Sequence, residues 1–152
     1  MHQEFCKIFS RFVEENGIKE NEFGLEITET AELEDTKKAG ESLERLKKRG
    51  IKIALDDFGA GYASLKYIRD LPIDVVKLDR HFTSNISDPS TSRLIKFVAD
   101  VCAELNLEMI GEGIETEKEK NMMIELGCVT GQGFLMHMPS FIEDIKKENN
   151  DG

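Results

Sequence analysis

The chain has 152 residues and a formal net charge of −10, with 20 Lys and Arg against 30 Asp and Glu. This length suffices for one globular domain with a core and is too short for two ordinary ones. Neutralising phosphates requires a surplus of Lys and Arg, so the acidic composition argues against binding to a nucleic acid polymer.

No apolar run approaches the ~20 residues needed to span a bilayer, so we expect no transmembrane segment in this chain. Three cysteines are far apart in the sequence, at Cys6, Cys102 and Cys128. Their odd number and wide spacing argue against a disulfide framework or a Cys-based zinc site, and favour the reducing cytoplasm.

Helical and strand periodicities alternate along the chain. Apolar residues at helical spacing predict helices over residues 4–16, 39–46, 62–70, 94–105, 122–126 and 141–145. Apolar runs between them predict strands at residues 23–28, 51–56, 75–79, 107–111 and 129–136. A polar loop containing Pro89 is expected before the long helix at 94–105.

This alternation predicts an α/β fold of parallel strands joined by helical crossovers. The strand spacing is close to the ~30 residues of one unit in a (β/α)8 barrel, although a doubly wound open sheet would alternate in the same way. Polar side chains at alternate positions near the strand ends favour the barrel, because each strand then faces helices on one side and a polar mouth on the other. We therefore expect a TIM-type barrel family, here as a partial barrel with about five parallel strands.

Four carboxylates are predicted to meet at this mouth, from Glu26, Asp56, Asp57 and Glu112. Their mutual repulsion would be costly without a compensating cation. An oxygen-only ligand set favours Mg²⁺ or Mn²⁺, and two adjacent aspartates suit a pair of ions acting on a phosphodiester. Lys77 would then orient the attacking water or stabilise charge on the phosphate.

A second interpretation stays open for these residues. A single strand-end carboxylate often caps a helix or joins a salt bridge, and Lys77 and Asp79 could form an ordinary ion pair. Recurrence of polar residues on consecutive strands favours the metal site.

Five sequence blocks resemble the EAL domain, the bacterial phosphodiesterase family that acts on cyclic di-GMP. In order and spacing they are residues 25–29 (LEITE), 56–62 (DDFGAGY), 77–79 (KLD), 112–116 (EGIET) and 131–135 (GQGFL). The resemblance extends from Phe5 to Pro139. It implies a modified (β/α)8 barrel that hydrolyses cyclic di-GMP to linear pGpG with Mg²⁺ or Mn²⁺, using two ions in the intact domain.

The resemblance also implies roles for individual residues. Glu26 and Asp56 match metal ligands, Asp57 matches the second-metal aspartate, and Lys77 matches the lysine that contacts the catalytic water. Glu112 matches a glutamate that acts as the general base or in binding the second metal. The remaining matches anchor the 56–62 loop or lie on the substrate side: Glu29, Phe58, Gly59, Gly61, Asp79, Glu115 and Gln132.

Departures from the family pattern leave an alternative function open. Ala60 and Ala63 stand where Thr and Ser are common, and Met138 stands where a basic residue is frequent. The alternative is a degenerate EAL domain that acts as a cyclic di-GMP-binding or protein-interaction regulatory module.

The family's opening Glu-x-Leu block and its Asn-containing strand have no match in the chain. We therefore expect residues 1–145 to be the C-terminal part of an EAL domain, truncated at its N-terminus and inactive or nearly so in isolation, followed by a polar tail at 146–152. Such a piece is expected to self-associate or to pair with the missing part of the same domain. An upstream GGDEF or sensory domain, in a cytoplasmic or membrane-anchored parent protein, would fit this pattern.

Overall fold

The computed structural model describes residues 8–9, 11–13, 15–17, 23–28, 35–60 and 64–140. The named elements are, in chain order, β1 (Gly24–Thr28), α2 (Thr36–Lys47), β2 (Lys52–Phe58), α3 (Ser64–Asp70), β3 (Val75–Leu78), α4 (Arg80–Ser84), α5 (Pro89–Glu104), β4 (Glu108–Gly111), α6 (Glu117–Glu125) and β5 (Thr130–Gly131). The expected first helix is helical at 8–9, 11–13 and 15. The helix expected at 141–145 and the tail at 146–152 lie outside the described residues.

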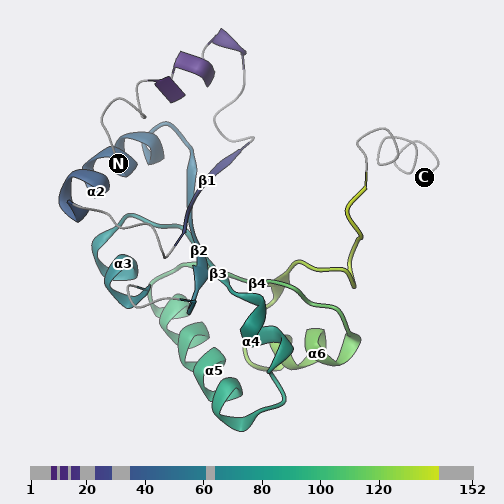
Figure 1. The fold of residues 1–152 in the computed structure, drawn as a ribbon. Coiled ribbons are helices and arrows are strands. Elements are labelled where there is room, and N and C mark those ends of the chain that lie inside the picture. The colour runs from purple at the N-terminus through teal and green to yellow at the C-terminus, as the bar shows by residue number, and fades with distance from the viewer. Residues whose placement is uncertain are drawn as a thin grey trace.

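The five strands form one parallel sheet in the order β1-β2-β3-β4-β5. Each strand therefore lies beside its predecessor in the sequence, with a helix in every crossover (Figure 1). A doubly wound sheet reverses its strand order at a switch point, and the described strands contain no such reversal. The α/β class with five parallel strands is confirmed, and the sequential order is that of a barrel.

The core lies between the sheet and the helices that cover one of its faces. Ile53 and Leu55 of β2 and Val76 and Leu78 of β3 are completely buried. Packed with them in the same core are Leu43 and Leu46 of α2 and Ile95 of α5. Burying each such side chain stabilises the fold by roughly 1.5–3 kcal/mol. Because these residues alternate along the strands, the face that carries them packs against the helices. The opposite face carries the polar residues.

The long helix differs from its predicted extent. α5 begins at Pro89, whereas residue 94 was predicted. Asp88 caps it by accepting hydrogen bonds from the backbone N–H groups of Ser90 and Thr91. Pro89 suits the first turn, because a backbone N–H at this position would have no partner within the helix and its absence costs nothing. The short helix α4 was also missed.

The last strand is much shorter than predicted. β5 covers only Thr130–Gly131, and residues 134–136 form a turn. Gly133 lies so close to the backbone of Ile114 that a Cβ atom would stand 2.2 Å from its carbonyl oxygen. The amide of Leu135 donates to that same oxygen, so the chain folds back over Ile114 and leaves the sheet. In the described part of the chain, no helix is long and apolar enough to cross a membrane.

Candidate metal and active site

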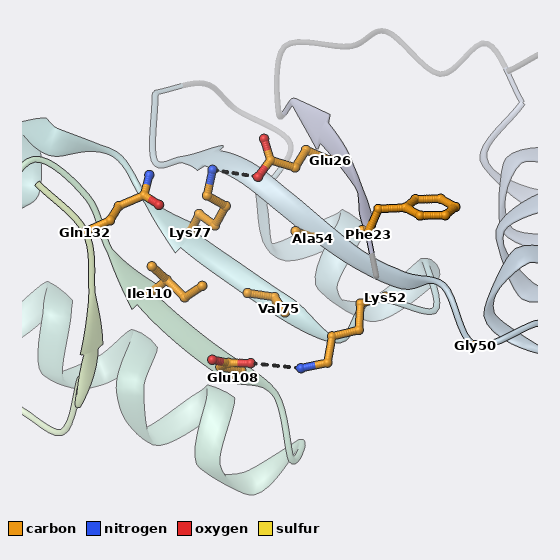
Figure 2. Close-up of a pocket in the computed structure, with 11 residues that line it drawn as sticks. Phe23, Glu26, Gly50, Lys52, Ala54, Val75, Lys77, Glu108, Ile110 and Gln132 are labelled. Carbon is orange, nitrogen blue, oxygen red and sulfur yellow. Dashed lines mark hydrogen bonds and ion pairs between the residues drawn. The ribbon is translucent and has the colours of Figure 1, made fainter. Parts of the chain in front are cut away.

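The carboxyl ends of the strands bring charged side chains together on the helix-free face. Lys77 of β3 lies at the centre, with its Nζ 2.9 Å from Glu26 Oε1 of β1 and 2.9 Å from Asp56 Oδ1 of β2. The same nitrogen lies 2.8 Å from Oε1 of Glu112, the residue after β4. Figure 2 shows the pair between Lys77 and Glu26 above the sheet. One lysine therefore links four of the five strands, β1 to β4.

Lys77 keeps its charge in this setting. The side chain is only 10% exposed, and burial by itself would lower its pKa; hydrogen bonds to Asp56, Glu112 and Glu26 outweigh that effect and raise the pKa above its ordinary value. The ammonium is thus a fixed cation at the centre of the acidic groups.

Asp57 reaches the same site through an irregularity in β2. Consecutive strand residues normally point to opposite faces, so Asp56 and Asp57 should diverge. The pairing of β2 with β3 shifts between Leu55 and Phe58, which places one extra residue in β2. Asp57 adopts a φ of +54° at this bulge. Because a bulge re-aims side chains beside it, both aspartates face the site.

These residues fit a divalent cation. Asp56, Asp57 and Glu112 each offer an oxygen within 4.8 Å of the others. Burial raises the pKa of Glu112; Lys77 lowers it, whereas Asp56 and Asp57 raise it further. Asp56 Oδ1 is enclosed and contacts Lys77 Nζ at 2.9 Å. Three carboxylates share one lysine, and such a cluster of hard oxygens is the ligand set that Mg²⁺ or Mn²⁺ prefers.

The other predicted residues divide into two groups. Gln132 donates from Nε2 to Glu112 Oε1 at 2.7 Å, and Glu115 forms an ion pair with Arg80 at 3.7 Å, so both belong to the rim of the site. Asp79 caps α4, accepting from the amide of His81 at 2.8 Å. It also lines a hollow beyond the strand ends, so the helix cap and the predicted substrate-side position are compatible.

The loop after β2 is described only as far as residue 60. Phe58 is 5% exposed and belongs to the core, where it packs behind the bulge. Gly59 has a φ of +99° and lies against Phe82, which leaves no room for a Cβ atom. Glu29 and Gly61 lie outside the described residues. Glu26, predicted as a metal ligand, contacts Lys77 and stands apart from the three-carboxylate cluster.

Two hollows adjoin the cluster. One, of about 760 Å³, lies along the helix-free face of the sheet and includes Glu26, Lys77 and Gln132 (Figure 2). The other, of about 690 Å³, lies beyond the strand ends and shares Asp57 and Glu112 with the cluster.

Three side chains in the second hollow were missed from the sequence: Arg80, Phe134 and His137. For Arg80 a signal existed, because it follows the third strand at the edge where the acidic residues gather. Phe134 lies in the 131–135 block that carries the family resemblance, although it was not named as a site residue, and His137 gave no signal because it follows the strand predicted at 129–136.

Comparison with known proteins gives consistent matches. Residues 1–139 match the family model described as EAL domain. The chain is 33% identical over 135 residues to the probable cyclic di-GMP phosphodiesterase PdeI of Escherichia coli, an alignment covering 89% of this chain and 17% of that protein. The chain thus spans about a sixth of that relative's length.

Solved structures match the fold as closely. The EAL domain of Mycobacterium smegmatis DcpA superposes with a TM-score of 0.91 and 29% identity, over 100% of this chain and 69% of that one. Klebsiella pneumoniae BlrP1, in a manganese and cyclic di-GMP complex, gives a TM-score of 0.79 and 27% identity, over 88% and 34% of the two chains.

Proposed function

The chain belongs to the EAL domain family, and from this premise we propose that it forms part of a metal-dependent phosphodiesterase domain that hydrolyses cyclic di-GMP to linear pGpG. The observation that carries the proposal is the contact of Lys77 with Glu26, Asp56 and Glu112, with Asp57 turned towards them. The naming of a relative as a cyclic di-GMP phosphodiesterase supports the substrate.

In this proposal the acidic cluster holds the metal. Asp56, Asp57 and Glu112 would bind Mg²⁺ or Mn²⁺, and the manganese complex of BlrP1 supports the choice of ion. A divalent ion so bound supplies Lewis-acid polarisation of a phosphoryl oxygen and lowers the pKa of water. The domain is expected to use two ions, with Asp57 serving the second.

Lys77 acts beside the metal site. Its ammonium is held in place by three carboxylates, which account for its three N–H donors, so one of these carboxylates must turn away before the ammonium donates to a water or a phosphate. We assign it the orientation of the attacking water and stabilisation of negative charge on the phosphate, the task of a positioned donor. Glu112, with its raised pKa, is placed to accept a proton from that water. Gln132 holds the Glu112 carboxylate through its amide.

The hollow beyond the strand ends is assigned to the substrate. It borders the cluster and adds Arg80, which pairs with Glu115 at its rim. A cation there offsets the repulsion that an acidic chain exerts on an approaching phosphate. By family match, Glu29 would anchor the loop at 56–62, and Gly59 and Gly61 of that loop are assigned to the substrate side.

Hydrolysis is tested in a chimera, because the chain matches 69% of the M. smegmatis EAL domain structure and is expected to turn over slowly or not at all alone. The matched residues of that domain are replaced by this chain, and pGpG is measured by chromatography with Mn²⁺ or Mg²⁺. Formation of pGpG that is lost in Lys77→Met and Asp57→Asn chimeras would support the proposal. A folded chimera without turnover would overturn it.

A binding module is the second candidate. Its support is that Lys77 already compensates the carboxylates, so that the cluster holds together with no other cation. The same chimera distinguishes the two functions. Calorimetry that shows cyclic di-GMP binding, with no pGpG in either metal, would favour a regulatory domain.

A further inference from the structure

Thr83 of α4 is a fully buried polar residue whose side chain reaches another element. It is 0% exposed. Its Oγ1 lies 2.9 Å from the carbonyl oxygen of Arg80, within the same helix, and 2.5 Å from that of Glu112. A hydroxyl has one hydrogen to donate, and the shorter contact is the one to Glu112. The side chain therefore joins the helix after β3 to the end of β4.

The turn that carries Glu112 fits closely against α4. Gly113 has a φ of +66°, and a Cβ atom there would stand 2.6 Å from the Cβ of Arg80. On the other side, the amide of Glu112 donates to the carbonyl of Leu78 at 3.2 Å. The backbone of Glu112 is thus held at its N–H by β3 and at its carbonyl by Thr83.

This backbone anchoring has a consequence for the site. The Glu112 carboxylate lies 2.8 Å from Lys77 Nζ and 2.7 Å from Gln132 Nε2. Glu112 itself follows the last residue of β4 and is therefore outside the regular strand. We propose that Thr83 is a positioning residue: its hydroxyl fixes the Glu112 carbonyl and so aims the Glu112 carboxylate at the metal site. The effect on metal binding rests on the proposed function, whereas the effect on the Glu112 backbone does not.

A purely structural role is the alternative, and the chain offers a matched control for it. Ser42 of α2 is 2% exposed, and its hydroxyl donates to the carbonyl of Lys38 at 3.0 Å, within its own helix. Removing either hydroxyl removes a part-buried hydrogen bond to a backbone carbonyl. Only the Thr83 hydroxyl contacts the strand end that bears a candidate ligand.

The test uses the 152-residue chain with Thr83→Val, Thr83→Ser and Ser42→Ala. Mn²⁺ affinity is measured by calorimetry, and hydrogen exchange of the Glu112 amide is measured by NMR in EDTA. Thr83→Val, which keeps the shape, should weaken Mn²⁺ binding about 10-fold, the lower end of what lost supporting hydrogen bonds cost a metal site. It should also speed exchange at Glu112. Thr83→Ser should restore both, and Ser42→Ala should change neither.

Each contrary result has a distinct meaning. An unchanged rate of hydrogen exchange at the Glu112 amide in Thr83→Val would overturn the proposal. Equal losses of Mn²⁺ affinity in Thr83→Val and Ser42→Ala would overturn it as well. If the unaltered chain binds no Mn²⁺, the metal-dependent function fails for this chain, and exchange at Glu112 alone decides whether Thr83 positions that residue.

Discussion

At the scale of single residues, the backbone of Asp57 matters as much as its carboxylate. Its φ of +54° lies in the left-handed region, which costs a typical residue about 1–2 kcal/mol and which Asn and Asp adopt more readily. We expect Asp57→Asn to keep the bulge, and Asp57→Ala to lower the free energy of unfolding by about 1 kcal/mol. Both should bind Mn²⁺ at least about 10-fold more weakly, because a ligand is lost. Urea titration and calorimetry measure the two effects.

Asn106 supplies the control for this prediction. It has a φ of +56° at the end of α5, away from the cluster. Asn106→Ala should therefore cost a similar free energy of unfolding and leave Mn²⁺ affinity unchanged. Equal stability of Asp57→Asn and Asp57→Ala would show that the bulge does not depend on left-handed backbone at this position.

At the scale of elements, the site depends on α4 packing against the end of β4. Gly113→Ala would combine an unfavourable φ of +66° with a Cβ atom 2.6 Å from that of Arg80. Left-handed alanine costs about 1–2 kcal/mol and overpacking typically another 1–3. Gly50→Ala, with a φ of +93° and nothing within 4 Å of the new Cβ, meets only the first cost. Thermal unfolding should place Gly113→Ala well below Gly50→Ala, and a reversed order would contradict the close packing.

The alternation of strand residues carried most of the prediction at this scale. Because side chains alternate between the two faces of a strand, the sequence places Ile53 and Leu55 on one face and Asp56 on the other. Because the strands run in the same direction, it also predicts that Lys77 and Glu112 lie at the same edge of the sheet. These features follow from the chain's own local pattern. The fold class and much of the cluster were therefore predictable.

What could not be predicted depends on contacts distant in the sequence. The bulge that turns Asp57 into the site arises from the register between β2 and β3, and no local signal specifies a register shift. The early end of β5 arises from Gly133 meeting the backbone of Ile114. Asp79, grouped with the substrate side on the family match, lines the hollow beyond the strand ends and also caps α4 by accepting a hydrogen bond from the amide of His81; its role as a cap depends on the short helix α4, which was not predicted.

At the scale of the whole molecule, one face of the sheet bears a hollow and, among the described residues, no helix covers it. Val75 and Ile110 line its hollow beside the ion pair of Lys52 with Glu108. Within the described residues, β1 and β5 each pair with a single neighbour, and edge strands with unpaired backbone groups readily pair with another chain. We expect the chain to self-associate, so that its sedimentation coefficient rises with concentration. One monomeric species at every concentration, with a cooperative melt, would contradict this expectation.

Two buried cysteines report on how cooperatively this molecule is held together. Cys102 of α5 and Cys128, between α6 and β5, are each 2% exposed. Burial raises the pKa of both thiols from 9.0 to about 11, so at pH 8 each forms roughly 100-fold less thiolate than an ordinary cysteine. In a Cys6→Ser variant, a thiol reagent at pH 8 should therefore label the native chain only through opening, and labelling in denaturant should be complete at once.

The relative rates at the two thiols distinguish two kinds of opening. The core contains both thiols in one cluster with Ile114 and Met123, which predicts that they become exposed together, at equal rates that increase together with urea. Separate rates would mean that the molecule opens in parts. Faster labelling of Cys128 would show that α6 and β5 detach while α5 stays folded, and the Gln132 contact to Glu112 would then be the first part of the site to be lost.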